Sequence, residues 1–132
     1  MSSMSAAAKS IVGYGIYLVG QGLVLLLIPN IALKLFGLPE ALDVWVRVTG
    51  MTVTFFGIYY FVAARYEWRP FFVTTLFTRL AVPVIFAIFA ATNLASWNIL
   101  LFTPADILFT LWTIWALRRD MRSAQAAQPA MA

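Results

Sequence analysis

Charged side chains inside apolar stretches are the residues of this sequence best suited to chemistry. Arg79 lies near the middle of residues 71–92 (FFVTTLFTRLAVPVIFAIFAAT), a run that is otherwise uncharged. A guanidinium stays protonated at every accessible pH, so a buried Arg79 needs a carboxylate, water or an anionic ligand beside it. Arg47 and Asp106 lie near the starts of two other apolar runs. Such residues can form an ion pair, bind an anion or line an ion path.

Most other catalytic and metal-binding side chains are missing. The sequence has no cysteine, which excludes disulfides, thiol relays and thiolate metal sites. It has no histidine, which removes the usual general base and His-ligated haem, zinc or copper. Its five acidic residues are scattered along the chain. We therefore expect a protein that is not an enzyme and has no metal site and no cofactor.

The composition predicts the surroundings in which these charges act. Hydrophobic residues make up 63% of the 132 residues and charged residues 11%, and the mean hydropathy is +0.89. A soluble domain carries about twice this charge density. A chain of this size cannot bury so much apolar surface within itself, so the remainder must face lipid. We predict an all-α integral membrane protein, folded as a four-transmembrane-helix bundle.

Four apolar runs are long enough to cross a bilayer, at approximately residues 9–28, 42–64, 71–92 and 99–118. Residues 31–38 are too short to span, and their apolar side chains around Lys34 predict an amphipathic segment at the membrane surface. Residues 1–122 would then form one membrane domain. The Ala/Gln/Pro-rich residues 123–132 predict a flexible tail.

Positive charges predict the orientation. Six of the nine Lys and Arg residues belong to the side with both termini and the second connection: Lys9, Arg65, Arg69, Arg118, Arg119 and Arg122. The opposite side has Lys34 and Arg47. The positive-inside rule therefore predicts a multi-pass protein with both termini in the cytoplasm. Tryptophans near the span ends fit an aromatic belt: Trp45, Trp68, Trp97 and Trp115.

Each predicted span carries a stripe of polar or small residues at helical spacing. The stripes comprise Ser10, Tyr14, Tyr17 and Gln21; Arg47, Gly50, Thr54 and Gly57; Thr75 and Arg79; and Thr103, Asp106, Thr110 and Thr113. Four such stripes most simply face a shared interior. For the glycines and threonines we favour close packing and interhelical hydrogen bonds over ligand contact.

Depth in the membrane decides which charges can meet. Thr103 and the following proline resemble a helix start, which places Asp106 near the outer surface at a depth similar to that of Arg47. Arg79 lies about 13 Å from the cytoplasmic edge and leans toward it. We therefore predict an Arg47–Asp106 pair, as a structural clamp or a gate, and no committed partner for Arg79. An Asp106–Arg79 pair remains open if the fourth helix begins near Asn98.

Short motifs follow one another along the apolar runs: LLIPN and FGLPE after the first, VRVTG and FFGIYYFVAAR across the second, TRLAV in the third and ADILFTLWTIWALRR in the fourth. Through these motifs, over most of residues 11–119, the chain resembles DoxX-like and related small four-helix bacterial membrane proteins. The resemblance implies a compact bundle in the bacterial inner membrane, sometimes associated with redox or quinone-linked systems. It supplies no catalytic residues, and its polar landmarks match Arg47, Arg79 and Asp106.

These features favour a non-enzymatic module that binds a lipid-like or anionic amphiphile within its bundle. Arg79 would hold the polar head, and further contacts would come from Tyr14, Tyr17, Gln21 and Thr75. One alternative is a proton- or anion-coupled transporter or channel that uses Arg79 and Asp106. Another is an accessory subunit of a quinone-linked or other membrane complex. The expected partners are membrane lipids and a second copy or a larger membrane complex, and not nucleic acid.

Overall fold

The computed structural model describes residues 4–127, and this part of the chain is helical without any strand. The helices are α1 (Ala6–Leu27), α2 (Pro29–Leu35), α3 (Trp45–Arg65), α4 (Arg69–Ala91), the 3-10 helix η1 (Trp97–Phe102) and α5 (Thr103–Ala127). Helices α1, α3, α4 and the continuous η1–α5 segment are each long and apolar enough to cross a membrane. The prediction of an all-α fold with four candidate spans is confirmed.

Helix ends differ from the predicted ranges where local capping decides them. Helix α1 begins at Ala6 because the Ser5 side chain caps it, accepting a hydrogen bond from the Ala8 amide at 3.0 Å. Helix α2 begins at Pro29, a residue suited to a first turn. Helix α5 continues to Ala127, so the flexible tail predicted from residue 123 is not seen over its first five residues. The rest of that tail lies outside the described residues.

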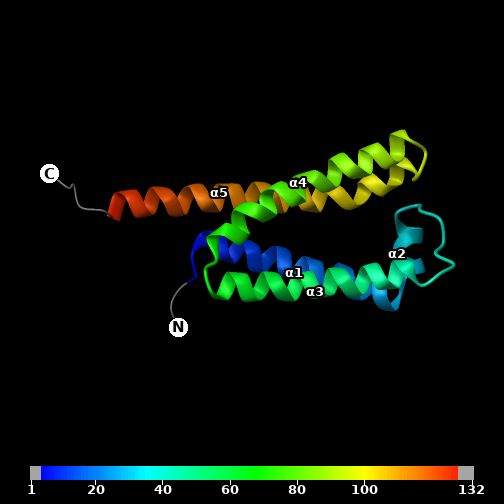
Figure 1. Cartoon of the computed structure of the whole chain (residues 1–132), viewed down its shortest axis with the longest axis horizontal. Coiled ribbons are helices and arrows are strands. Elements are labelled where there is room, and N and C mark those ends of the chain that lie inside the picture. The colour runs from blue at the N-terminus through cyan, green and yellow to red at the C-terminus, as the bar shows by residue number, and fades with distance from the viewer. Residues whose placement is uncertain (1–3, 128–132) are drawn as a thin grey trace.

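The helices form two pairs (Figure 1). Helices α1 and α3 lie side by side, and α4 lies against α5. The pairs meet through α1 and α5 near the N-terminus and the α3–α4 turn, and they diverge toward α2 and η1. Helix α4 leaves α3 soon after the turn that joins them. Because α3 and α4 contact each other little beyond the turn that joins them, we call this side of the bundle its open side.

Glycines bring the α1 and α3 backbones into contact. A Cβ built on Gly50 would lie 2.6 Å from the carbonyl oxygen of Gly22, and one on Gly57 would lie 2.8 Å from that of Gly15. Both distances are too short for a real side chain, so the two helices touch backbone to backbone. This is the close approach that small residues permit between membrane helices. The packing role favoured for Gly50 and Gly57 agrees with these contacts.

Replacing Gly22 by alanine is expected to destabilise the α1–α3 pair. The new Cβ would meet the Gly50 carbonyl oxygen at 2.7 Å and the Thr54 amide nitrogen at 2.5 Å, and backbone atoms cannot rotate away. Overpacking of this kind costs about 1–3 kcal/mol. Gly20→Ala, two residues earlier on α1, is the matched control, because nothing lies within 4 Å of its Cβ. Melting in the same detergent should separate the two variants; equal melting temperatures would contradict this interface.

Two carboxylates hold the N-terminus of α1 against the rest of the bundle. Glu67, in the α3–α4 turn, accepts hydrogen bonds from the Ser5 amide and hydroxyl, each at 2.7 Å. Asp120, on α5, accepts from the Ala6 amide at 3.1 Å and the Ala7 amide at 2.9 Å. Anions suit these positions because the first amides of a helix lack intrahelical partners. We call this end of the molecule, where Ser5, Glu67 and Asp120 meet, the clamp end.

The opposite end is joined by contacts between the loop after α2 and η1. The rings of Phe36 and Phe102 have centroids 4.5 Å apart, and the Asn98 side chain donates to the Gly37 carbonyl oxygen at 3.1 Å. Gly37 has a φ of 67°, which glycine adopts without strain. The two helix pairs are thus connected at both ends.

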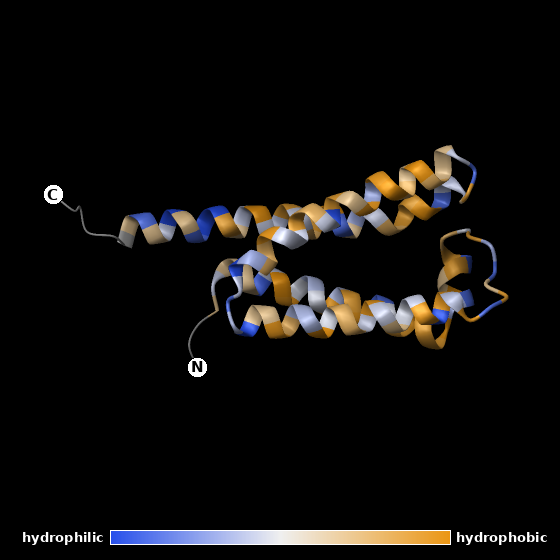
Figure 2. Ribbon diagram, viewed as in Figure 1, coloured by the Kyte–Doolittle hydropathy of each residue, from blue (hydrophilic) through white to orange (hydrophobic). Residues whose placement is uncertain are grey.

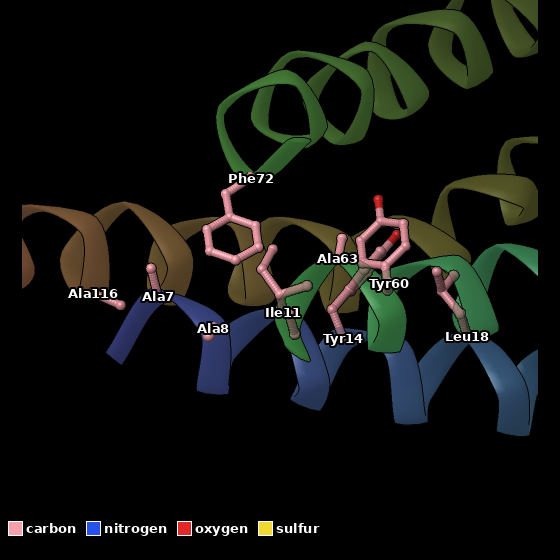
Figure 3. Packing of buried hydrophobic residues seen from close by; sticks show 10 residues of the cluster. Ala7, Ala8, Ile11, Tyr14, Leu18, Tyr60, Ala63, Phe72 and Ala116 are labelled. Carbon is pink, nitrogen blue, oxygen red and sulfur yellow. The ribbon is translucent and has the colours of Figure 1, made fainter. Parts of the chain in front are cut away.

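The apolar core lies near the clamp end (Figure 3). Phe72 of α4 is fully buried and points onto Ile11 of α1, while Ala116 of α5 approaches Ala7. Elsewhere the apolar side chains are largely exposed, for example Phe77 at 72% on α4. Figure 2 shows this apolar surface along the candidate spans, with hydrophilic residues at the turns and on the end of α5. The outer surface therefore has the character of one that faces lipid.

Candidate functional site

Arg79 is buried where α4 crosses α1 and α5. Its side chain is 2% exposed. One terminal nitrogen donates to the hydroxyl of Thr75, one turn earlier on α4, at 2.8 Å, and the other donates to the hydroxyl of Thr113 on α5 at 3.2 Å. Within residues 4–127 its Nε has no hydrogen-bond partner. The guanidinium thus has two neutral hydroxyl acceptors and an unused donor.

Two tyrosine rings cover the guanidinium. The Arg79 Cζ atom lies 4.4 Å from the ring centroid of Tyr14 and 5.8 Å from that of Tyr60. The two rings are 5.2 Å apart (Figure 3). A cation over an aromatic face is stabilised by the ring quadrupole, more strongly where water is excluded. Cation–π contacts therefore replace part of the hydration that Arg79 loses on burial.

Asp106 belongs to the same buried region. It is 8% exposed, and its Oδ1 accepts a hydrogen bond from the Tyr14 hydroxyl at 2.6 Å. Tyr14 therefore contacts the cation with its ring and the carboxylate with its hydroxyl. The described part of the chain has one ion pair within 4.0 Å, between Arg69 and Asp120 at 3.8 Å, so Asp106 reaches Arg79 only through Tyr14. We call this set the Arg79 cluster: Tyr14, Tyr60, Thr75, Arg79, Asp106 and Thr113.

The predicted Arg47–Asp106 pair is not formed. Arg47 is exposed, and it donates to the carbonyl oxygens of Leu26 at 2.6 Å and Leu27 at 3.3 Å. The last carbonyls of α1 lack intrahelical partners and attract a cation, which explains this choice. Helix α5 begins at Thr103, as its proline suggests, but the 3-10 helix η1 precedes it, so Asp106 lies inside one continuous helical segment that begins at Trp97. This is close to the Asn98 start for which an Asp106–Arg79 pair remains open, yet no such ion pair forms among the described residues.

Of the remaining predicted ligand residues, one lies in the cluster, one at its border and one outside it. Thr75 lies in the cluster as a buried acceptor for Arg79. Tyr17 is half-buried at its border, with its ring centroid 5.8 Å from that of Tyr14. Gln21 lies two turns beyond Tyr14 and makes no side-chain hydrogen bond among the described residues, so the structure does not bring it into the cluster. The contact that α1 makes with Arg79 thus comes from Tyr14, in the clamp-end half of this helix.

Two members of the cluster were not predicted as site residues. Tyr60 follows Gly57 at a helical spacing of three, so it continues the stripe on α3 that ended with this glycine. Thr113 was on the fourth stripe but was assigned to packing. Its hydroxyl accepts from Arg79 and lies 2.9 Å from the Ser10 hydroxyl. Extending each stripe by one turn would have found Tyr60.

An apolar groove lies beside the cluster on the open side of the bundle. It has a volume of about 540 Å³ and is lined by Tyr59, Val62, Ala63, Tyr66, Trp68 and Phe71. The Phe71 ring stands edge-on to the Tyr60 ring, with centroids 4.9 Å apart and planes at 83°. Phe71 of the groove lining thus contacts Tyr60, which in turn lies over the guanidinium.

Tyr14→Phe is expected to lower the free energy of unfolding while keeping the cation–π contact. The change removes the hydroxyl that donates to the buried Asp106, and an unsatisfied buried acceptor costs about 1–3 kcal/mol. Tyr59→Phe is the control, since Tyr59 is 57% exposed on α3. Chemical denaturation in detergent would measure both. A similar small shift in the two variants would show that the Tyr14–Asp106 hydrogen bond does not stabilise the fold.

The fold and the cluster define a class: an all-helical protein with four candidate membrane spans and a buried contact chain from arginine through tyrosine to aspartate. No protein-family model, curated protein or solved structure matches the chain. The resemblance to DoxX-like proteins therefore stays a prediction from the sequence motifs.

Proposed function

We propose that this chain is a multi-pass protein of the bacterial inner membrane that binds an anionic amphiphile at Arg79, without catalysis. The amphiphile would have a carboxylate, sulfonate or phosphate head and an alkyl or acyl tail. Both termini would be cytoplasmic, because the clamp end carries six of the nine positive residues. Exposed Trp68 and Trp115 at this end, and Trp45 and Trp97 at the other, are consistent with two membrane interfaces.

The observation that carries the proposal is the incomplete partnering of Arg79. A buried cation is costly unless it is paired, and a carboxylate in direct contact is the usual solution. Arg79 instead has two hydroxyl acceptors, two ring faces and an unused Nε–H donor. An anionic oxygen beside Nε would accept a charge-assisted hydrogen bond, which is about twice as strong as a neutral one.

The groove between α3 and α4 supports access from the lipid side. Its apolar walls suit an alkyl chain, and Phe71 in its lining contacts Tyr60, the ring that lies over Arg79. Since Arg79 is only 2% exposed, a head group reaches it when these rings move apart. Helix α4 diverges from α3 beyond the turn (Figure 1), so this movement need not separate α4 from α3 along their length.

Binding of oleate and of oleyl alcohol to the purified protein in a neutral detergent tests the proposal. The two probes share a C18 chain and differ in the charge of the head. We expect the site at Arg79 to bind oleate at least about tenfold more tightly than oleyl alcohol, since one charge-assisted hydrogen bond contributes about 1.5–3 kcal/mol. Equal binding of the two probes would show that the head group is not recognised.

A proton- or anion-coupled transporter is the second candidate, favoured by the placement of Asp106 and Arg79 on either side of Tyr14. Ionisable groups in contact within a membrane span commonly form proton or ion paths. Proteoliposomes should then show anion flux that Asp106→Asn abolishes. Binding without flux would leave the protein as a binding module.

A further inference from the structure

Helix α5 carries a second amphiphilic surface, separate from the Arg79 cluster. Among residues 103–126 of α5, Ala116 is the last buried one, and the helix continues from there to Ala127 beyond the other helices (Figure 1). A groove of about 530 Å³ runs along it across this boundary. The groove is lined by Leu111, Ile114, Trp115, Arg118, Arg119, Arg122 and Ser123.

The lining changes from apolar to cationic along the helix. Leu111, Ile114 and Trp115 lie on the bundle side of the groove, and the arginines lie beyond them. The Arg119 Cζ atom is 5.4 Å from the Trp115 ring centroid, so these two side chains are in contact at the boundary between the apolar and the cationic lining residues. Tryptophan prefers the boundary between hydrocarbon and head groups. The groove therefore has an apolar part beside the bundle and a cationic part beyond it, the order expected across a membrane interface.

Within residues 4–127, no carboxylate neutralises the positive charge of this groove. Arg118, Arg119 and Arg122 make no ion pair within the described residues, and no acidic residue lines the groove. The nearest carboxylate along the helix, Asp120, is bound to the Ala6 and Ala7 amides at the N-terminus of α1. Three uncompensated guanidinium groups match the charge and the hydrogen-bonding geometry of a phosphate.

We propose that this groove binds an anionic phospholipid, with the phosphate at Arg118, Arg119 and Arg122 and an acyl chain along Leu111 and Ile114. Charge complementarity favours this occupant. The order of the lining residues favours it too, because the apolar part matches an acyl chain and the cationic part matches the phosphate that follows it in a phospholipid. The site lies in the same leaflet as the termini. It requires membrane insertion but is independent of any ligand at Arg79.

Native mass spectrometry of the protein in neutral detergent tests this site, with phosphatidylglycerol and phosphatidylcholine of identical acyl chains as probes. We expect phosphatidylglycerol to be retained preferentially, and Arg118→Gln/Arg122→Gln to reduce its retention about tenfold. Lys9→Gln/Arg65→Gln removes the same charge at the same end of the molecule outside this groove and should retain the lipid. These four side chains are exposed, so both variants should melt as the unmodified protein does.

Two results would overturn this site. Equal retention of the two phospholipids would show that the arginines do not recognise head-group charge. An equal loss of phosphatidylglycerol in both double variants would show that net charge, and not this groove, attracts the lipid.

Discussion

Arg79→Met is expected to abolish the preference of the Arg79 site for oleate over oleyl alcohol, measured in the Arg118→Gln/Arg122→Gln background so that the groove on α5 does not contribute. Methionine keeps an unbranched chain of similar length but removes the charge and all five N–H donors. The affinity for oleate should fall about tenfold or more, while oleyl alcohol should bind as before, because the groove beside the cluster is unchanged. Titration of both probes against each protein in the same neutral detergent measures the effect.

Arg47→Met is the matched control for this prediction. Arg47 is also an arginine within a candidate span, but it is exposed and bonded to the last carbonyls of α1. The substitution removes the same charge, so oleate binding should stay within about twofold of that of the unmodified protein. A loss of equal size in both variants would mean that oleate responds to net charge and not to the Arg79 cluster.

Asp106→Asn is expected to act in the opposite direction and strengthen oleate binding. Asp106 shares Tyr14 with Arg79, so its negative charge opposes an anion that approaches the guanidinium. Removing a like charge several ångströms away in a protein interior gains roughly 1–2 kcal/mol, or about tenfold in affinity. Asparagine can still accept the hydrogen bond from the Tyr14 hydroxyl. Oleate titration of Asp106→Asn beside Asp43→Asn, an exposed aspartate before α3, measures the difference.

The double variant Arg79→Met/Asp106→Asn separates binding from folding. Replacing a buried pair of charges by neutral groups is commonly neutral or stabilising, whereas leaving one charge alone is costly. If Arg79 serves a ligand, the double variant should melt at or above the unmodified protein and still lack the oleate preference. A double variant destabilised by several kcal/mol would identify the cluster as a structural clamp.

The fold was largely predictable because hydropathy alone defines the spans. The runs of apolar residues predicted four helices, and Pro29 and the charged turn around Glu67 separated them. The pairing of the helices was not predictable in detail. Contacts between Gly22 and Gly50 depend on which helices are neighbours, and glycine spacing alone is equally compatible with a dimer face. The hydrogen bonds from the α1 N-terminus to Asp120 likewise join residues more than a hundred positions apart.

The candidate site was predicted in part. The stripes placed Arg79, Thr75 and Tyr14 toward one interior, where the structure has them in contact. The predicted helix start at Thr103 is correct for α5, but the Arg47–Asp106 pair is wrong: η1 extends the helical segment back to Trp97, and Arg47 is bound to carbonyls of α1. The carbonyls that bind Arg47 could not be identified from residue types, because they belong to the backbone.

The central claim is that an anionic head group lies at Arg79, and photo-crosslinking tests it most directly. A C18 fatty acid with a diazirine next to its carboxylate would be bound to the protein in neutral detergent, irradiated and mapped by peptide mass spectrometry. The account predicts adducts on Tyr14, Tyr60 or Thr75 that oleate competes away and that Arg79→Met removes. Adducts spread over the exposed faces of α4, or unchanged in Arg79→Met, would contradict it.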